Sequence, residues 1–99
     1  MARYEVFKAP AGKGFVLDIQ SDLLDKLNTR VVVPLLPRSI APKPADRLNP
    51  VLLIKDKECV MVTQFMSAVP ISVLGISVAK IDNAHAEITA AIDMLTQGF

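Results

Sequence analysis

The chain has 99 residues and a formal net charge of +1 at pH 7, and 52% of its residues are hydrophobic. The length predicts one domain, the small net charge argues against a strongly basic nucleic-acid binder, and the single cysteine excludes an internal disulfide. The apolar content exceeds what so small a core can bury, so we expect a subunit interface and a homodimer. Without a basic-then-apolar leader in residues 1–8, the sequence is typical of a cytoplasmic protein.

Two short runs near the start of the chain are predicted to form a β-hairpin. Residues 3–8 alternate well enough for a first strand, with Tyr4 and Val6 on one face, and residues 15–20 supply its partner. Residues 9–14 contain a proline and two glycines, which suit a loop somewhat longer than a tight turn.

Residues 21–25 predict a helical turn after this hairpin. Ser21 or Asp22 can cap its exposed amides. Leu23 and Leu24 cannot both face inward easily, so this pair is either a core plug or a contact surface.

The middle of the chain combines strands with a proline-rich loop. Residues 29–36 form a β-branched run that predicts a central third strand, ended or bulged by Pro34. Residues 37–50 contain four prolines and more basic than acidic side chains, which indicates a surface loop with a basic tilt. Residues 51–54 and the run from Glu58 onward predict a second hairpin.

Residues 59–79 contain no charged side chain. A transmembrane helix is one interpretation, but Pro70, Gly75 and several polar residues favour two short strands, 59–65 and 69–74, buried in a sheet. Because Pro70 cannot donate to a strand ladder, the second strand should lie at a sheet edge or open with that residue.

The end of the chain predicts one helix. Residues 83–96 are good helix formers, and Asp82 is its expected N-cap. Apolar residues recur at helical spacing, which predicts a face packed on the sheet: Ile81, Ala84, Ile88, Ala91, Ile92 and Leu95. Gly98 predicts the helix end, and Phe99 either docks into the core or contacts a partner.

Few side chains are suited to catalysis. Structural roles are favoured for His85 and Cys59, which with Asp82 match no standard zinc spacing, and no cofactor is expected. The surviving enzyme hypothesis is a metal-free nuclease, in which basic side chains contact phosphate and a carboxylate acts as the base: Arg30, Arg38, Lys43 and Arg47, with Asp18 or Glu58.

Seven short motifs run from the first strands to the last residue: 17–22 (LDIQSD), 29–35 (TRVVVPL), 48–50 (LNP), 66–70 (MSAVP), 73–75 (VLG), 91–93 (AID) and 97–99 (QGF). Each motif is weak alone. In their order, spacing and total length they resemble the CcdB-type toxins of bacterial toxin–antitoxin modules.

This resemblance implies an α+β, mainly β fold, with one domain over residues 1–99 that forms a small SH3-like antiparallel β-barrel or sheet and a C-terminal helix. It implies a non-enzymatic homodimer that binds the A subunit of DNA gyrase and traps the cleaved-DNA complex. A CcdA-like antitoxin, whose C-terminal part folds on binding, would remove the toxin and with it repress the operon, so operator DNA would be contacted only through that complex.

Carried over by position, the resemblance assigns two surfaces. The gyrase-binding residues would be Leu23, Leu24, Asp93, Gln97, Gly98 and Phe99, which favours partner contact for the leucine pair and for Phe99. The antitoxin is expected over residues 8–14 and 38–47, where positive charge suits an acidic disordered partner: Lys8, Lys13, Arg38, Lys43 and Arg47.

The chain departs from the family pattern at its end. CcdB-type toxins usually end in tryptophan, glycine and an aliphatic residue, whereas this chain ends in Gln97, Gly98 and Phe99. Two alternatives to a gyrase poison stay open: a MazF-like endoribonuclease toxin, suggested by the shared fold and the basic loop, and a non-toxic homologue that only binds the antitoxin, suggested by the missing tryptophan.

Overall fold

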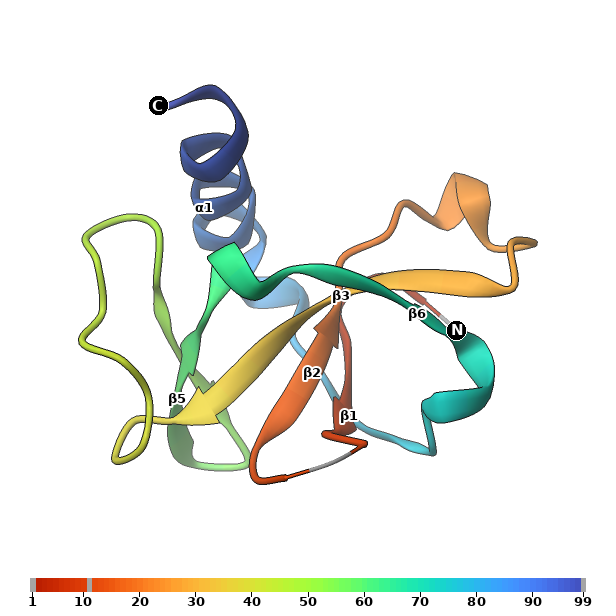
Figure 1. The fold of residues 1–99 in the computed structure, drawn as a ribbon, viewed down its shortest axis with the longest axis horizontal. Coiled ribbons are helices and arrows are strands. Elements are labelled where there is room, and N and C mark those ends of the chain that lie inside the picture. The colour runs from red at the N-terminus through yellow and green to blue at the C-terminus, as the bar shows by residue number, and fades with distance from the viewer. Residues whose placement is uncertain (1, 11, 99) are drawn as a thin grey trace.

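The longest strand of the computed structural model, β3 (Thr29–Pro37), runs through the middle of an antiparallel sheet that curls into a half-barrel (Figure 1). The structure describes residues 2–10 and 12–98. The other strands are β1 (Glu5–Lys8), β2 (Phe15–Asp18), β4 (Val51–Ile54), β5 (Lys57–Met61), β6 (Ser67–Pro70) and β7 (Ser77–Lys80). The sheet order is β4-β5-β3-β2-β1-β7, and β6 pairs with β3 beside β5. The mainly β, α+β fold expected from the sequence is confirmed.

The helical elements are short except at the end of the chain. Three 3-10 turns connect strands in the described residues, η1 (Asp22–Leu24), η2 (Thr63–Phe65) and η3 (Ile71–Val73), and a further one, η4 (Asp82–Ala84), leads from β7 into the helix. The α-helix α1 (His85–Gln97) follows η4 directly and stands against one end of the half-barrel (Figure 1).

Contrary to the prediction from the sequence, strand β3 neither ends nor bulges at Pro34. One side of β3 pairs with β2, and the other pairs first with β6 at residues 29–32 and then with β5 at residues 35–37. The Pro34 carbonyl accepts a hydrogen bond from the Val62 amide. Because the N–H and C=O of a strand residue point to the same side, the donor that Pro34 lacks would face the Val62 carbonyl. That carbonyl accepts from the Phe65 amide instead, where the chain leaves β5 for η2, so the proline leaves no carbonyl opposite it unpaired.

The first strand begins at Glu5, two residues later than predicted. Tyr4 has a φ of 70°, in the left-handed region, which interrupts the extended backbone. Its side chain is buried, and its hydroxyl is hydrogen-bonded to Nδ1 of His85. The predicted alternation holds, because Val6 packs in the main core while Phe7 joins a smaller cluster on the other face.

The predicted packing face of α1 is largely confirmed. Ile88 and Ala91 are fully buried against the inner face of the sheet, whereas Leu95 is 39% exposed and lies outside the core. Asp82 is not the N-cap: it opens η4, and Ala84 occupies the cap position without a side-chain hydrogen bond. Gly98 ends the helix as predicted, with φ +82° and its amide donating to the carbonyls of Asp93 and Met94.

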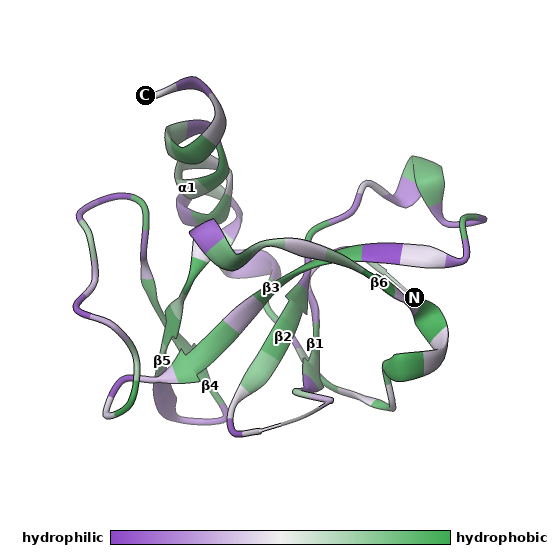
Figure 2. Cartoon of the chain, in the orientation of Figure 1, coloured by the Kyte–Doolittle hydropathy of each residue, from purple (hydrophilic) through white to green (hydrophobic). Residues whose placement is uncertain are grey.

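The charge-free stretch is only half buried, contrary to the sequence-based expectation. Its first part, residues 59–63, is buried, but the segment from β6 to β7 is mostly exposed, with Ile76 88% accessible. Pro70 closes β6 instead of opening it, although β6 does lie at an edge with β3 as its partner. In Figure 2 the turn η3, which follows β6 in this outer segment, is coloured largely as hydrophobic. Among the described residues, no helix is long and apolar enough to cross a membrane.

Candidate functional site

The turn η1 carries the most exposed large hydrophobic side chain among the residues described. Leu23 is 92% exposed and Leu24 is 50% exposed. The turn is capped as predicted, because Oγ of Ser21 accepts a hydrogen bond from the Leu23 amide at 3.2 Å. Neither leucine plugs the core of its own chain, so of the two interpretations left open by the sequence, the structure favours a contact surface.

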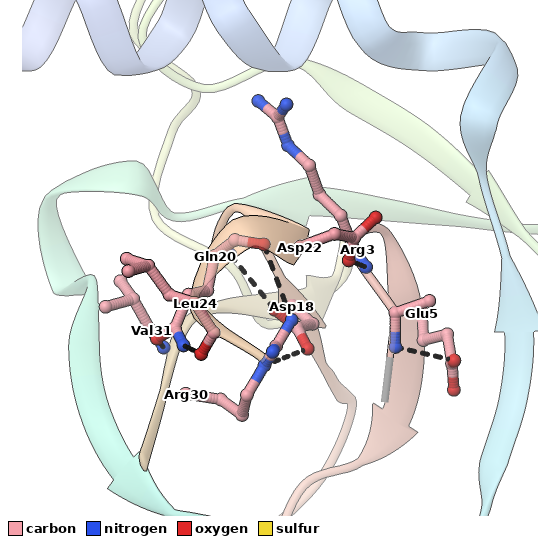
Figure 3. A network of polar contacts seen from close by, with 9 residues as sticks. Arg3, Glu5, Asp18, Gln20, Asp22, Leu24, Arg30 and Val31 are labelled. Atoms are coloured by element: carbon pink, nitrogen blue, oxygen red, sulfur yellow. Dashed lines mark hydrogen bonds and ion pairs between the residues drawn. The ribbon is translucent and has the colours of Figure 1, made fainter. Parts of the chain in front are cut away.

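A buried ion pair lies directly beneath this turn (Figure 3). Nε of Arg30 donates to Oδ2 of Asp18 at 2.7 Å, and both side chains are fully buried. The other oxygen of that carboxylate, Oδ1, accepts from the backbone N–H of Gln20 at 3.0 Å. Nη2 of Arg30 donates to the backbone carbonyl of Gln20 at 3.4 Å. The backbone of Gln20 is thus held at both its N–H and its C=O.

The side chain of Gln20 continues the network to the surface. Its Nε2 donates to the Leu24 carbonyl at 3.0 Å, and its Oε1 accepts from the Val31 amide at 3.1 Å (Figure 3). A second bond ties the turn to the start of the chain, where Oδ1 of Asp22 accepts from the Arg3 amide at 2.8 Å. The turn is therefore fixed by polar contacts.

The end of α1 forms a second exposed surface. Gln97 and Gly98 are exposed, and Asp93 is partly buried one turn earlier on the helix. Phe65 of η2, which packs against α1, is 57% exposed. The predicted site residue Phe99 lies outside the described residues.

Figure 1 places η1 and the end of α1 apart, on different sides of the half-barrel. The described residues that the resemblance assigns to gyrase binding therefore do not converge within one chain. They form two surfaces, one at Leu23 and Leu24 and the other at Asp93, Gln97 and Gly98.

The basic residues assigned to antitoxin binding lie on loops, except Lys8, which ends strand β1. Lys8 and Lys13 are exposed at the first hairpin, and Lys43 and Arg47 are exposed on the proline-rich loop, defined here as residues 38–50. Arg38 is already paired, since its Nη1 lies 3.0 Å from Oε2 of Glu58. The proline-rich loop rises along the side of the sheet toward α1 (Figure 1), where it forms a groove lined also by Glu87 and Ala90.

The same contacts contradict the nuclease site drawn from the sequence. Arg30 and Asp18 are buried and bonded to each other, so Arg30 cannot contact a phosphate and Asp18 cannot accept a proton from a bound substrate in this conformation. Arg38 and Glu58 are likewise each other's partners at the surface. Of the two predicted bases, Asp18 is therefore unavailable, and Glu58 is held in an exposed ion pair.

The remaining chemically active side chains have structural surroundings. Cys59 is fully buried in the core, and desolvation by burial raises the pKa of its thiol, with a smaller opposing effect of Lys57. His85 bonds the buried Tyr4. Within residues 2–10 and 12–98, no group of three or more histidine, cysteine, aspartate or glutamate side chains could hold a metal ion.

Sequence reasoning missed Gln20 and Phe65. Gln20 belongs to one of the resemblance motifs, but nothing in its local pattern shows that its amide bonds the exposed turn. Phe65 falls in a run that was expected to be buried, and its exposure becomes visible only when η2 replaces a continuing strand.

Comparison with known protein families gives a match over almost the whole chain. The family model described as CcdB protein matches residues 3–98. The match includes both surfaces described above apart from the last residue.

Proposed function

Because the chain belongs to the CcdB family of toxins from toxin–antitoxin modules, we propose that it is a gyrase poison that acts through protein contact. In this proposal a homodimer binds the A subunit of DNA gyrase in the cytoplasm and traps the complex in which DNA is cleaved. A CcdA-like antitoxin neutralises it, and operator DNA is contacted only through the toxin–antitoxin complex.

The observation that carries this proposal is the pair of exposed leucines on a turn held from below. Burying a leucine side chain fully contributes roughly 1.5–3 kcal/mol, and Leu23 has nearly all of that burial still to gain. A turn whose backbone is already held by hydrogen bonds loses less conformational freedom on binding than a mobile loop would. An exposed, fixed apolar turn is thus suited to a protein interface.

The end of α1 supplies the second contact. Because this surface lies apart from η1 in one chain, a partner that uses both must either span the half-barrel or contact two copies. A homodimer offers both surfaces twice, which agrees with the apolar side chains left exposed at Phe65, Val73 and Ile76.

For the antitoxin, the loops around Lys13, Lys43 and Arg47 offer positive charge to an acidic segment. Arg38 joins them only if an incoming carboxylate replaces Glu58, its partner in the free chain. That exchange swaps one exposed ion pair for another and costs little.

The test is a gyrase cleavage assay with purified protein. Intact protein should convert supercoiled plasmid to linear DNA in the presence of gyrase, and the double variant Leu23→Ala, Leu24→Ala should require at least about tenfold more protein, since truncating an interface anchor costs about 1–2 kcal/mol or more. Leu53→Ala is the matched control, because Leu53 is 66% exposed on β4 and belongs to neither assigned surface.

Three results would overturn the proposal. If the intact protein leaves gyrase unaffected while it binds the antitoxin, the chain is the non-toxic homologue, an alternative favoured by Gln97 at the position of the family's tryptophan. If Leu53→Ala weakens the effect as much as the double variant does, the leucine turn is not the contact. Cleavage of cellular RNA by pure protein would instead indicate the endoribonuclease.

A further inference from the structure

The turn η1 is held almost without apolar packing. None of its three residues is buried, and a single 3-10 turn has little stability of its own because so short a helix closes few hydrogen bonds. Its conformation therefore depends on the bonds made by Ser21, Asp22 and Gln20.

Of these three anchors, only Gln20 connects the turn to the interior. Ser21 bonds within its own turn, and Asp22 bonds the backbone of Arg3 near the start of the chain. Gln20 is 6% exposed and joins the Leu24 carbonyl to the Val31 amide on the central strand. Loss of the Gln20 side-chain amide would free the C-terminal end of the turn, where Leu24 lies.

The ion pair behind Gln20 is better explained by position than by stability. A buried ion pair is often no more stabilising than apolar residues of similar volume, and here Nη1 of Arg30 is buried with no hydrogen-bond partner. Unlike an apolar pair, this ion pair bonds both backbone groups of Gln20. Asp18 accepts from the backbone N–H, and Arg30 donates to the backbone carbonyl.

We propose that Asp18, Arg30 and Gln20 form a positioning unit that holds η1 in its partner-binding shape, with the Gln20 side chain as the link to Leu24. None of the three touches the partner. This inference rests on the proposed function, since it assigns the leucine turn to the gyrase interface.

The test replaces the amide of Gln20 while keeping its length, and compares it with a second buried amide. Gln20→Met removes both side-chain bonds. Asn49→Leu is the matched control: Asn49 is also 6% exposed and ties the proline-rich loop to the barrel through bonds with Ala45, Met61 and Gln64. Each change leaves two backbone groups without their side-chain partner, so both variants should lose comparable stability.

Two measurements, binding to the purified gyrase protein and amide hydrogen exchange, should then separate the two variants. We expect Gln20→Met to weaken gyrase binding about tenfold and to speed exchange at the Leu24, Asp25 and Leu27 amides, while Asn49→Leu changes neither. In a background with Leu23→Ala and Leu24→Ala, Gln20→Met should add little further loss, because residues that act through one another are not additive.

The outcomes distinguish this inference from the proposed function. Unchanged exchange in η1 after Gln20→Met overturns the positioning unit, whether or not gyrase is bound. Full additivity with the leucine changes also overturns it, because Gln20 would then act elsewhere. Absence of gyrase binding by the unaltered protein overturns the proposed function, while exchange in η1 still decides whether Gln20 holds the turn.

Discussion

The leucine turn and the proline-rich loop both leave the same half-barrel and each is bonded to it by a buried side-chain amide, yet they present opposite chemistry. Gln20 holds a turn whose exposed side chains are apolar, whereas Asn49 holds a loop whose exposed side chains include Lys43 and Arg47. The ion pair beside Gln20 is buried, whereas the ion pair that the loop residue Arg38 forms with Glu58 is exposed.

This difference follows from the range of the two forces. Apolar contact acts only when surfaces fit closely, so the shape of the leucine turn has to be fixed before a partner arrives. Attraction between charges acts over roughly 8–10 Å at physiological salt, so the basic loop can meet an acidic chain without one fixed shape. The deeper anchoring of η1 is consistent with its carrying the apolar contact.

The largest expected effect comes from breaking the buried ion pair. Arg30→Met leaves the Asp18 carboxylate buried without its partner and should lower the free energy of unfolding by about 3–5 kcal/mol. Arg38→Met removes the exposed pair and should cost less than about 1 kcal/mol. Urea denaturation of the two variants measures both values, and equal losses would refute the contrast between the two pairs.

A double variant sharpens the same comparison if Arg30→Met is too unstable to study. Asp18→Leu with Arg30→Met removes both charges, so much of the stability should return. Exchange at the η1 amides should stay fast nonetheless, because the Gln20 backbone has lost its side-chain partners. Recovery of slow exchange would show that the turn does not need the ion pair.

A smaller effect is expected where the loop of the first hairpin meets the end of strand β3. A Cβ at Gly14 would lie 2.5 Å from the Leu35 carbonyl oxygen, whereas a Cβ at Gly12 would meet nothing within 4 Å, and the two residues have similar positive φ values of +94° and +93°. Gly12→Ala should therefore cost only the backbone strain, roughly 1–2 kcal/mol, and Gly14→Ala clearly more because backbone must shift.

Thermal denaturation can rank these two glycine variants, since 1 kcal/mol corresponds to about 4–8 °C in Tm for a domain of this size. A larger fall in Tm for Gly14→Ala would show that the hairpin is packed against β3 at this point. Equal falls in Tm would mean that the loop of the first hairpin, residues 9–14, relaxes freely and that Lys13 is not held beside the sheet.

The parts of this architecture that depend on neighbouring residues could be predicted from the sequence. Both hairpins, the capped turn at Ser21 and the helix end at Gly98 were predicted because turn and cap residues act over a few positions. The parts that depend on distant partners could not. Pro34 is tolerated inside β3 because two separate strands share one side of it, and no local pattern records that arrangement.

The candidate site divides in the same way. The exposure of Leu23 and Leu24 was left open by the sequence, because the turn is held by a network that joins residues up to 19 positions apart. Arg30 was assigned to a surface from its charge alone, although its carboxylate partner makes it fully buried. A charged residue in a strand-forming run can thus hold the structure together from the interior, as Arg30 does, instead of contacting a phosphate at the surface.

The smallest expected effect tests the electrostatic side of the comparison. Lys43→Gln should weaken binding of the cognate antitoxin's C-terminal segment about two- to fivefold at low salt, mainly through slower association, because a peripheral charge steers the encounter more than it stabilises the complex. The loss should shrink as salt is raised, since screening weakens the attraction to the antitoxin for the unaltered protein and for Lys43→Gln alike.

Lys26→Gln is the matched control, with the same change in net charge at an exposed position just after η1. Stopped-flow association rates over a salt series give the answer. If both variants slow association equally, only net charge matters and the proline-rich loop has no special part in capture. If Lys43→Gln alone slows it, and gyrase binding is unchanged, the basic loop and the leucine turn serve different partners.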